Sequence, residues 1–222
     1  MKNLTLIIPA KHEKESLPHL LDELKEFHCQ ILIVLSKEDK STEDLIIKNE
    51  NINIVYQSKE GYGNALIQGF NSSKTEYSCI INADGSMDPK YLKEMLKLCE
   101  DKDLVFATRY DKPGGGSDDD TIVTYFGNKL FSFLGNILYN LNISDILYTY
   151  VVGKTKSFLD LELKSHDFRL CVELPIKAKL KRYKYICSPS YERSRIGGKK
   201  KVNALKDGFL ILVEMLSYIG KK

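Results

Sequence analysis

The sequence has no strong excess of charge of either sign. Its 33 lysines and arginines nearly balance its 30 aspartates and glutamates, so the formal net charge at pH 7 is +3. A protein surface that attracts nucleic acid usually depends on a larger and clustered positive charge. We therefore expect no nucleic-acid partner.

Paired cysteines are also absent. The five cysteines are odd in number, widely spaced and without a CxxC motif, which provides neither a disulfide framework nor a zinc site. Most of them stand in apolar runs, so we expect reduced and buried thiols. They are Cys29, Cys79, Cys99, Cys171 and Cys187.

No hydrophobic run is long enough to cross a membrane. A transmembrane helix needs roughly 20 apolar residues, whereas the apolar run near the C-terminus already ends at Glu214. The N-terminus enters a short apolar segment that ends at Pro9, without the features of a secretory leader. We find no internal repeat, and we expect a cytoplasmic protein.

What is present indicates an α/β protein. In the first half, short apolar runs rich in β-branched residues alternate with amphipathic segments of helical period, a pattern typical of βαβ units and a mainly parallel sheet. We predict strands at 4–9, 31–35, 52–56, 77–82 and 104–108 and helices at 16–27, 42–49, 63–71 and 89–99.

The second half begins with a glycine- and aspartate-rich segment at 111–120 that cannot pack a core. We predict a mobile loop there, either a lid or a solvated connection. Helices at 122–141 and near 168–181, strands near 148–153 and 185–188, and a last helix follow. We expect residues 1–198 to form one domain, with a basic loop and a terminal amphipathic helix at 199–222 packed on it.

One acidic residue follows a predicted strand at a position suited to a metal. Ligands of open α/β sheets bind at the carboxyl ends of the strands, and Asp84 comes just after the strand at 77–82. A carboxylate there can hold Mg²⁺ or Mn²⁺ against a diphosphate. The alternative interpretation is that Asp84 is only a turn residue before Gly85.

Several short motifs occur in one order along the chain. They are IIPA at 7–10 with Glu13, GYGNA at 61–65 with GF at 69–70, NADGS at 82–86, DP at 88–89, ATRY at 107–110, Asn128, Asp145, Glu173 and RIGGKKK at 195–201. Each is weak alone. Together they resemble the dolichyl-phosphate mannose synthase group, the polyprenyl-phosphate glycosyltransferases, within family 2 of the GT-A glycosyltransferases, over nearly the whole chain.

The resemblance implies a GT-A fold, that is, a Rossmann-like, mainly parallel central sheet flanked by helices, here with a C-terminal amphipathic helix. It implies an inverting hexosyltransferase with a GDP- or UDP-sugar as donor, a divalent cation (Mg²⁺ or Mn²⁺) as cofactor and a polyprenyl phosphate as acceptor. Two alternatives stay open: a family 2 enzyme that acts on a glycan hydroxyl, and a nucleotide-sugar-binding protein that has lost turnover.

The resemblance also assigns site residues. The nucleotide sugar would be bound by Pro9, Ala10, Glu13, Ser36, Asp39, Gly61, Gly63, Ala65, Asn82 and Ala83. The cation would be held by Asp84, Asn82 and Ser86. The phosphates would be neutralised by Arg109, Arg195 and Lys201, and Asp88 would serve as general base for a hydroxyl acceptor.

The chain departs from the family pattern at the metal motif. Asn82 replaces the first aspartate of the family's DAD motif, which removes one negative charge beside the cation, and Lys200 replaces the serine of RxxGxSK. The turns at 9–13 and 35–39 differ from the family's base-binding turns as well. We expect weaker metal binding and a greater dependence on basic side chains.

Two further expectations concern helices. Segments 125–141 and 204–219 are rich in apolar residues and could lie on a membrane surface, where a polyprenyl acceptor would be found; the alternatives are core packing and a homodimer seam. Glu173 stands in an apolar helix, where an unpaired carboxylate is costly, so we expect it to hold a basic partner.

Overall fold

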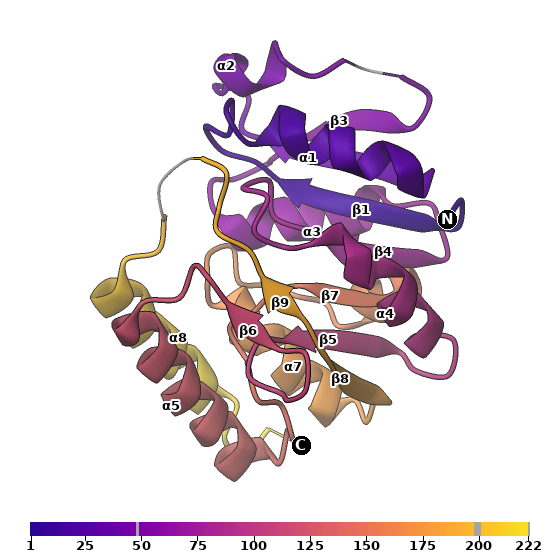
Figure 1. Ribbon diagram of the computed structural model, residues 1–222. Helices are drawn as coiled ribbons and strands as arrows, with labels where there is room; N and C mark the ends of the chain where they lie inside the picture. The colour runs from indigo at the N-terminus through magenta and orange to yellow at the C-terminus, as the bar shows by residue number, and fades with distance from the viewer. Residues whose placement is uncertain (48, 198–200, 222) are drawn as a thin grey trace.

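The computed structural model describes residues 1–47, 49–197 and 201–221, and its centre is a seven-stranded sheet (Figure 1). The strands are β1 (Leu4–Pro9), β2 (Gln30–Leu35), β3 (Ile52–Tyr56), β4 (Tyr77–Ile80), β5 (Leu104–Thr108), β7 (Val151–Lys154) and β8 (Tyr185–Pro189). Their order is β3-β2-β1-β4-β7-β5-β8, and only β7 is antiparallel to its neighbours. Two shorter strands, β6 (Gly116–Ser117) and β9 (Tyr191–Glu192), form a separate parallel pair.

Helices cover both faces of the sheet. They are α1 (Leu17–Leu24), α2 (Lys40–Glu43), α3 (Tyr62–Ser72), α4 (Leu92–Leu98), α5 (Ile122–Tyr139), α6 (Thr155–Asp160), α7 (Leu170–Leu180) and α8 (Ala204–Ser217), with 3-10 turns η1 (Lys25–Phe27) and η2 (Pro89–Tyr91). Side chains of a strand alternate between the faces, so Leu6 of β1 packs in the core with α1 and α4, whereas Ile7 packs in the core with α3 and α7. Two cores therefore hold the sheet.

The carboxyl ends of the parallel strands share one edge of the sheet. Because β7 runs the opposite way, it begins at that edge, and its register places Val152 opposite Cys79 of β4. The residues just before β7 thus lie beside those just after β4. This arrangement brings Tyr148 and Thr149 next to Asn82 and Asp84.

Most of the predicted elements are confirmed within about two residues, and the sheet is mainly parallel as expected. The helix predicted at 42–49 is wrong: Asp39 caps the start of α2, and the helix ends at Glu43, since Leu45 and Ile47 are exposed and give no buried face to extend it. The segment 111–120, predicted as a mobile loop, contains strand β6. A side chain at Gly116 would collide with the Tyr191 ring, so glycine permits this pairing.

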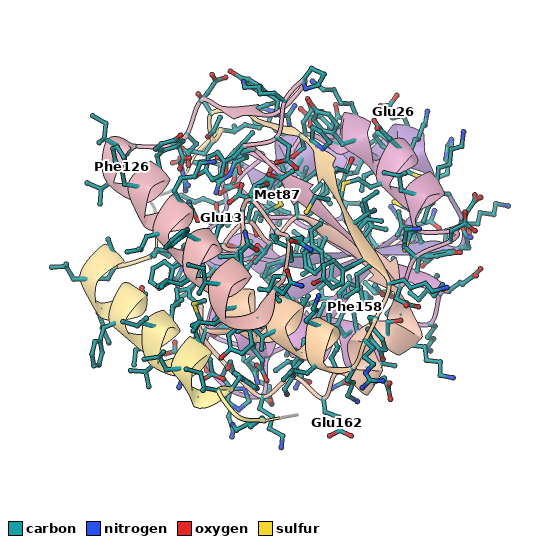
Figure 2. The ribbon with its side chains drawn as sticks, turned by 90° about the horizontal axis from the view of Figure 1, so that it is seen from below. Glu13, Glu26, Met87, Phe126, Phe158 and Glu162 are labelled. Carbon is teal, nitrogen blue, oxygen red and sulfur yellow. The ribbon has the colours of Figure 1, made fainter. Side chains whose placement is uncertain are left out.

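Helices α5 and α8 lie side by side at one edge of the molecule, as both views show (Figure 1, Figure 2). Ile211 and Met215 attach α8 to the core with α7. Of the predicted basic loop, Lys199 and Lys200 lie outside the described residues. Among the helices that are described, none combines the length and the hydropathy needed to cross a bilayer.

Glu173 has the basic partner that was predicted. It is fully buried in α7, its Oε1 lies 2.7 Å from Lys177 Nζ, and its two carboxylate oxygens accept hydrogen bonds from the backbone N–H groups of Lys164 and Ser165. Burial by itself raises the pKa of Glu173, but these donors outweigh it, so the pKa lies below its usual value. The ionised carboxylate holds the loop before α7 in place.

We predict that Glu173→Gln lowers the free energy of unfolding by about 2 kcal/mol, because the fully buried amide has a single oxygen and leaves one of the two backbone N–H donors without an acceptor. The folded-state pKa of Glu173 is lowered, so the loss of stability in the variant should be constant above the ordinary glutamate pKa of about 4.3. As the pH falls through the folded-state pKa, the wild-type carboxylate becomes protonated, and the difference in stability between wild type and variant should shrink. Urea unfolding of the wild type and the variant across this range measures it. The exposed Glu94→Gln serves as control, and a loss that grows toward acid pH would contradict the assignment.

Candidate active site

A cleft of about 690 Å³ opens at the carboxyl edge of the sheet. The strand-end residues form its floor, the segment from Glu192 to Arg195 with Lys201 forms one side, and α5 and α8 form its far end. Of the predicted site residues, those that line the cleft are Pro9, Ala10, Glu13, Ser36, Gly61, Ala65, Asn82, Ala83, Asp84, Arg109, Arg195 and Lys201. Residues from six separate parts of the sequence thus meet in one place, and most of these parts follow a strand of the sheet, as the strand-end rule predicts.

Asp84 lies on the floor of this cleft with one oxygen fixed by its own turn. Its Oδ1 accepts hydrogen bonds from the backbone N–H and from the hydroxyl of Ser86, at 3.1 and 2.9 Å. Its Oδ2 lies 3.5 Å from Nη1 of Arg195. Ser86 is buried and does not line the cleft. In this structure the Ser86 hydroxyl supports the carboxylate, and the metal-ligand role predicted for Ser86 stays a prediction.

A strand-like segment holds the Asp84 turn from the other side. The backbone N–H of Arg193 donates to the Ser86 carbonyl, and the N–H of Ile196 donates to the Asp84 carbonyl, both at 2.9 Å. Gly85 has a φ of +77°, and a Cβ there would lie 2.5 Å from the Ile196 side chain. Only glycine fits this close approach.

Arg193 is a site residue that the sequence motifs did not single out. Its guanidinium donates to the Gly85 carbonyl at 2.8 and 3.2 Å and makes a two-point ion pair with Glu23 of α1. It thereby ties the Asp84 turn to the first helix. No local pattern marks it, since its partners are 108 and 170 residues away.

Arg109 is the centre of a buried ion cluster. Its Nε and Nη2 bind Asp145 at 2.7 and 2.9 Å, its Nη1 binds Glu192 at 2.9 Å, and its side chain packs 4.5 Å from the centre of the Tyr148 ring. Desolvation lowers the pKa of Arg109, but the two carboxylates more than reverse this, so it remains cationic. Burial raises the pKa of Glu192 in turn, against the effect of Arg109. A phosphate contact by Arg109, as predicted, would require a carboxylate to give up this pair.

Two other basic residues stand at the cleft in weaker ion pairs. Arg195 donates to both oxygens of Asp119, at 3.2 and 2.9 Å, besides approaching Asp84. Lys201 pairs with Glu13, which also accepts from the Ser16 hydroxyl at 2.9 Å. Both cations are partly exposed, so an incoming anion can compete for them.

Asp39 does not line the cleft, contrary to the nucleotide-binding role predicted for it. It is 2% exposed and accepts hydrogen bonds from the backbone N–H groups of His12, at 2.6 Å, and Thr42. Burial raises its pKa, but these hydrogen bonds outweigh it and lower the pKa overall. The carboxylate thus holds the turn after β1 through these hydrogen bonds.

Asp88 also lies outside the cleft. Its side chain caps η2 through the Lys90 N–H, pairs with Lys90 Nζ at 2.9 Å and borders a separate depression with Glu23 and Glu26. Its side chain thus borders another depression than Asp84 does, and its role as general base stays a prediction. The sequence put it four residues from Asp84 but could not show its direction.

The glycines before α3 serve close packing. A Cβ on Gly63 would lie 2.2 Å from the Ser165 carbonyl oxygen, and one on Gly61, whose φ is +123°, would lie 2.1 Å from that of His166. The close approach lets the Asn64 N–H donate to the His166 carbonyl at 2.9 Å. Gly63 therefore allows close packing and does not itself line the cleft, and its contact with the nucleotide stays a prediction.

The far end of the cleft is apolar and passes between α5 and α8. Val123, Gly127 and Phe131 line it from α5, and Gly208 and Ile211 from α8. A Cβ built on Gly127 meets no atom within 4 Å, so there is free space in front of it. Residues of both helices thus border open space at this end of the cleft, which we call the apolar passage.

One polar side chain interrupts this apolar end. Asn128 of α5 is 6% exposed and lines the cleft, and its Oδ1 is buried without a hydrogen-bond partner among the described residues. Buried polar atoms are normally paired. An unpaired amide at this point is suited to a polar group of a ligand.

No group of three or more His, Cys, Asp and Glu side chains is arranged to hold a metal ion in the parts of the chain that the structure describes. Mg²⁺ in nucleotide sites is often held by one or two carboxylates together with substrate phosphates. Asp84 lines the cleft and can serve as such a single ligand. The residues thus fit a cation that arrives with a diphosphate.

Comparisons with known proteins agree with this geometry. Residues 5–161 match the family model described as Glycosyl transferase family 2. An uncharacterized glycosyltransferase of Mycobacterium tuberculosis is 25% identical over 95% of this chain and 94% of its own. An undecaprenyl-phosphate mannosyltransferase of Micrococcus luteus is 30% identical over 73% of this chain and 70% of its own.

Solved structures give the same fold. The crystal structure of glucosyl-3-phosphoglycerate synthase from Mycobacterium tuberculosis in complex with Mn²⁺, UDP and glucosyl-3-phosphoglycerate superposes with a TM-score of 0.75, over 99% of this chain and 80% of that chain, at 12% identity. At this identity the likeness concerns the fold alone, a GT-A fold. With the family model covering most of its length, the chain belongs to glycosyl transferase family 2.

Proposed function

We propose that this protein transfers a hexosyl group from a GDP- or UDP-sugar to a polyprenyl phosphate, with inversion at the anomeric carbon. The observation that carries the proposal is the shape of the cleft, which joins the charged floor at Asp84 to the apolar passage between α5 and α8. A cleft with one charged and one apolar end suits a substrate pair of a sugar nucleotide and an amphiphilic phosphate.

The relatives support the acceptor. One is the undecaprenyl-phosphate mannosyltransferase already described, and another is a dolichol-phosphate mannosyltransferase of Saccharomyces cerevisiae, 24% identical over 80% of this chain. A glycan hydroxyl as acceptor would need a positioned base to remove its proton. The direction of Asp88, away from the cleft, disfavours that alternative.

In the proposed reaction, the protein mainly aligns two anions and neutralises their charge. A divalent cation on Asp84 would supply positive charge to the leaving diphosphate. Arg195 and Lys201, which now pair with Asp119 and Glu13, would exchange these carboxylates for phosphate oxygens. An acceptor phosphate is already ionised at neutral pH, so alignment and neutralisation suffice.

We further propose that the outer sides of α5 and α8 touch a membrane surface. Phe126 points away from the body of the molecule (Figure 2) and is 65% exposed, and Phe209 of α8 is 67% exposed. Lys206 of α8 is exposed and can lie near anionic headgroups. A homodimer seam on this face is the alternative.

We predict that Asp84→Asn lowers the transfer rate roughly 100-fold, by analogy with the loss of a single charge-stabilising group in other enzymes. The variant keeps the side-chain shape but not the charge, so donor binding should weaken with Mn²⁺ present but should not weaken with a chelator, where the carboxylate holds no cation and only opposes the diphosphate. Radiolabelled transfer and calorimetry measure the two effects. Asp101→Asn, at an exposed position, is the control, and an Asp84→Asn enzyme of full activity would remove Asp84 from the site.

We predict that Gly127→Leu lowers kcat/KM for a short polyprenyl phosphate about tenfold, because the new side chain occupies the space that the polyprenyl group would take. A tenfold loss corresponds to about 1.4 kcal/mol. The helix should fold at least as well as before, since leucine is the better helix former. Donor affinity should not change, and Gly127→Ala is the matched control. Unchanged use of the lipid phosphate, together with transfer to a saccharide, would refute the proposed acceptor.

We predict that the double variant Phe126→Ser, Phe209→Ser binds vesicles containing phosphatidylglycerol at least several-fold more weakly, because it removes apolar area from the contact face. Co-sedimentation measures the binding, and Ile47→Ser, at an exposed position near α2, is the control. Two results together would favour the homodimer seam: equal vesicle binding by wild type and double variant, and analytical ultracentrifugation that finds a dimer for the wild type but a monomer for the double variant.

A further inference from the structure

Asn82 stands at the end of β4, where the family motif has an aspartate, and a chain of hydrogen bonds fixes its amide. Its Oδ1 accepts from Tyr62 Oη at 2.9 Å, and Tyr62 Oη lies 2.6 Å from Thr149 Oγ1. Tyr62 belongs to α3 and stacks on Phe168 with ring centres 5.3 Å apart. Three separate segments of the fold therefore set the orientation of one side chain.

The hydroxyl protons of Tyr62 and Thr149 decide the direction of these hydrogen bonds. Tyr62 has one phenolic proton, and burial raises its pKa, so it stays neutral and can donate once. If Thr149 donates to Tyr62 and Tyr62 donates to Asn82, each hydroxyl proton has an acceptor. In the opposite direction the proton of Thr149 would have none, because the described residues give its hydroxyl no other partner and the residue is 7% exposed.

This direction decides what Asn82 presents to the cleft. With Oδ1 turned to Tyr62, the Nδ2 group points away from Tyr62, and no described residue accepts its protons. Asn82 is only half-buried and lines the cleft beside Asp84. An aspartate here would offer oxygens alone, whereas Asn82 offers N–H donors.

We propose that Asn82 binds the nucleotide sugar as a hydrogen-bond donor through Nδ2, to an oxygen of the diphosphate or of the attached sugar, and is not a ligand of the cation. The inference rests on the proposed function, since it concerns the same donor site. It replaces the metal role predicted for Asn82 and leaves Asp84 as the protein's carboxylate ligand. The neutral donor also reduces the charge that opposes a diphosphate when no cation is bound.

The test is calorimetric binding of GDP- and UDP-hexoses to the full chain, once with Mn²⁺ and once with a chelator. Asn82→Ala should weaken binding about tenfold in both conditions, since the lost hydrogen bond does not involve the metal. Asn82→Asp should weaken binding further in the chelator, because a carboxylate repels the diphosphate. A loss confined to Mn²⁺, or tighter binding by Asn82→Asp with Mn²⁺, would show that residue 82 is a metal ligand and overturn the inference.

Tyr62→Phe tests the orienting chain. It removes the donor to Oδ1, so the affinity should fall several-fold in both conditions while kcat changes little, and Asn71→Ala, at an exposed position of α3, should have no effect. Thermal unfolding checks that each variant is folded. A wild type that binds none of these sugars would refute the proposed function itself, whereas binding that is equal in wild type and Asn82→Ala would refute only the role of Asn82.

Discussion

The buried ion cluster around Arg109 is the constraint on which the site depends. It joins the end of β5 to Asp145 before β7 and to Glu192 of β9, three segments that are distant in the sequence. A buried cation without partners is strongly unfavourable, so each of these carboxylates must stay in place once the arginine is buried. The cluster thereby fixes where the C-terminal segment crosses the carboxyl edge of the sheet.

That crossing in turn shapes the donor side of the cleft. After Glu192 the backbone runs along the Asp84 turn and donates to it from Arg193 and from Ile196. These two hydrogen bonds hold the turn, while the Arg193 guanidinium anchors it to α1. Asp84 is therefore positioned by backbone groups of residues more than 100 positions away. Precise placement of this carboxylate matters because Asn82 stands where the family motif has a second aspartate.

The same segment also connects the two halves of the cleft. After Arg195 the chain reaches Lys201 and then α8, which packs beside α5 and borders the apolar passage. In Figure 2, Glu13 lies near the middle of the molecule and Phe126 at its outer edge. A fold with one charged and one apolar wall can bring two chemically different substrates together.

Much of this could be predicted from the sequence because it depends on local patterns. Alternating apolar runs predicted the strands of the parallel sheet, and the position of Asp84 just after one of them placed it at the carboxyl edge. The prediction failed for the helix at 42–49, where the apolar residues do not share a buried face. It could not show that Asp88 turns away from the cleft, since the direction of a side chain after a strand depends on the turn that follows.

What the sequence determined by itself is the family, the sheet and the set of residues that follow its strands, since period, turn residues and motif order are all local properties. Only the tertiary structure decided which partners those residues have. Arg109 meets Asp145 and Glu192, Tyr62 orients Asn82, and Asp39 is consumed in a turn. The reason is physical: these hydrogen bonds join groups 20 to 83 residues apart, and their geometry exists only after the layers have packed.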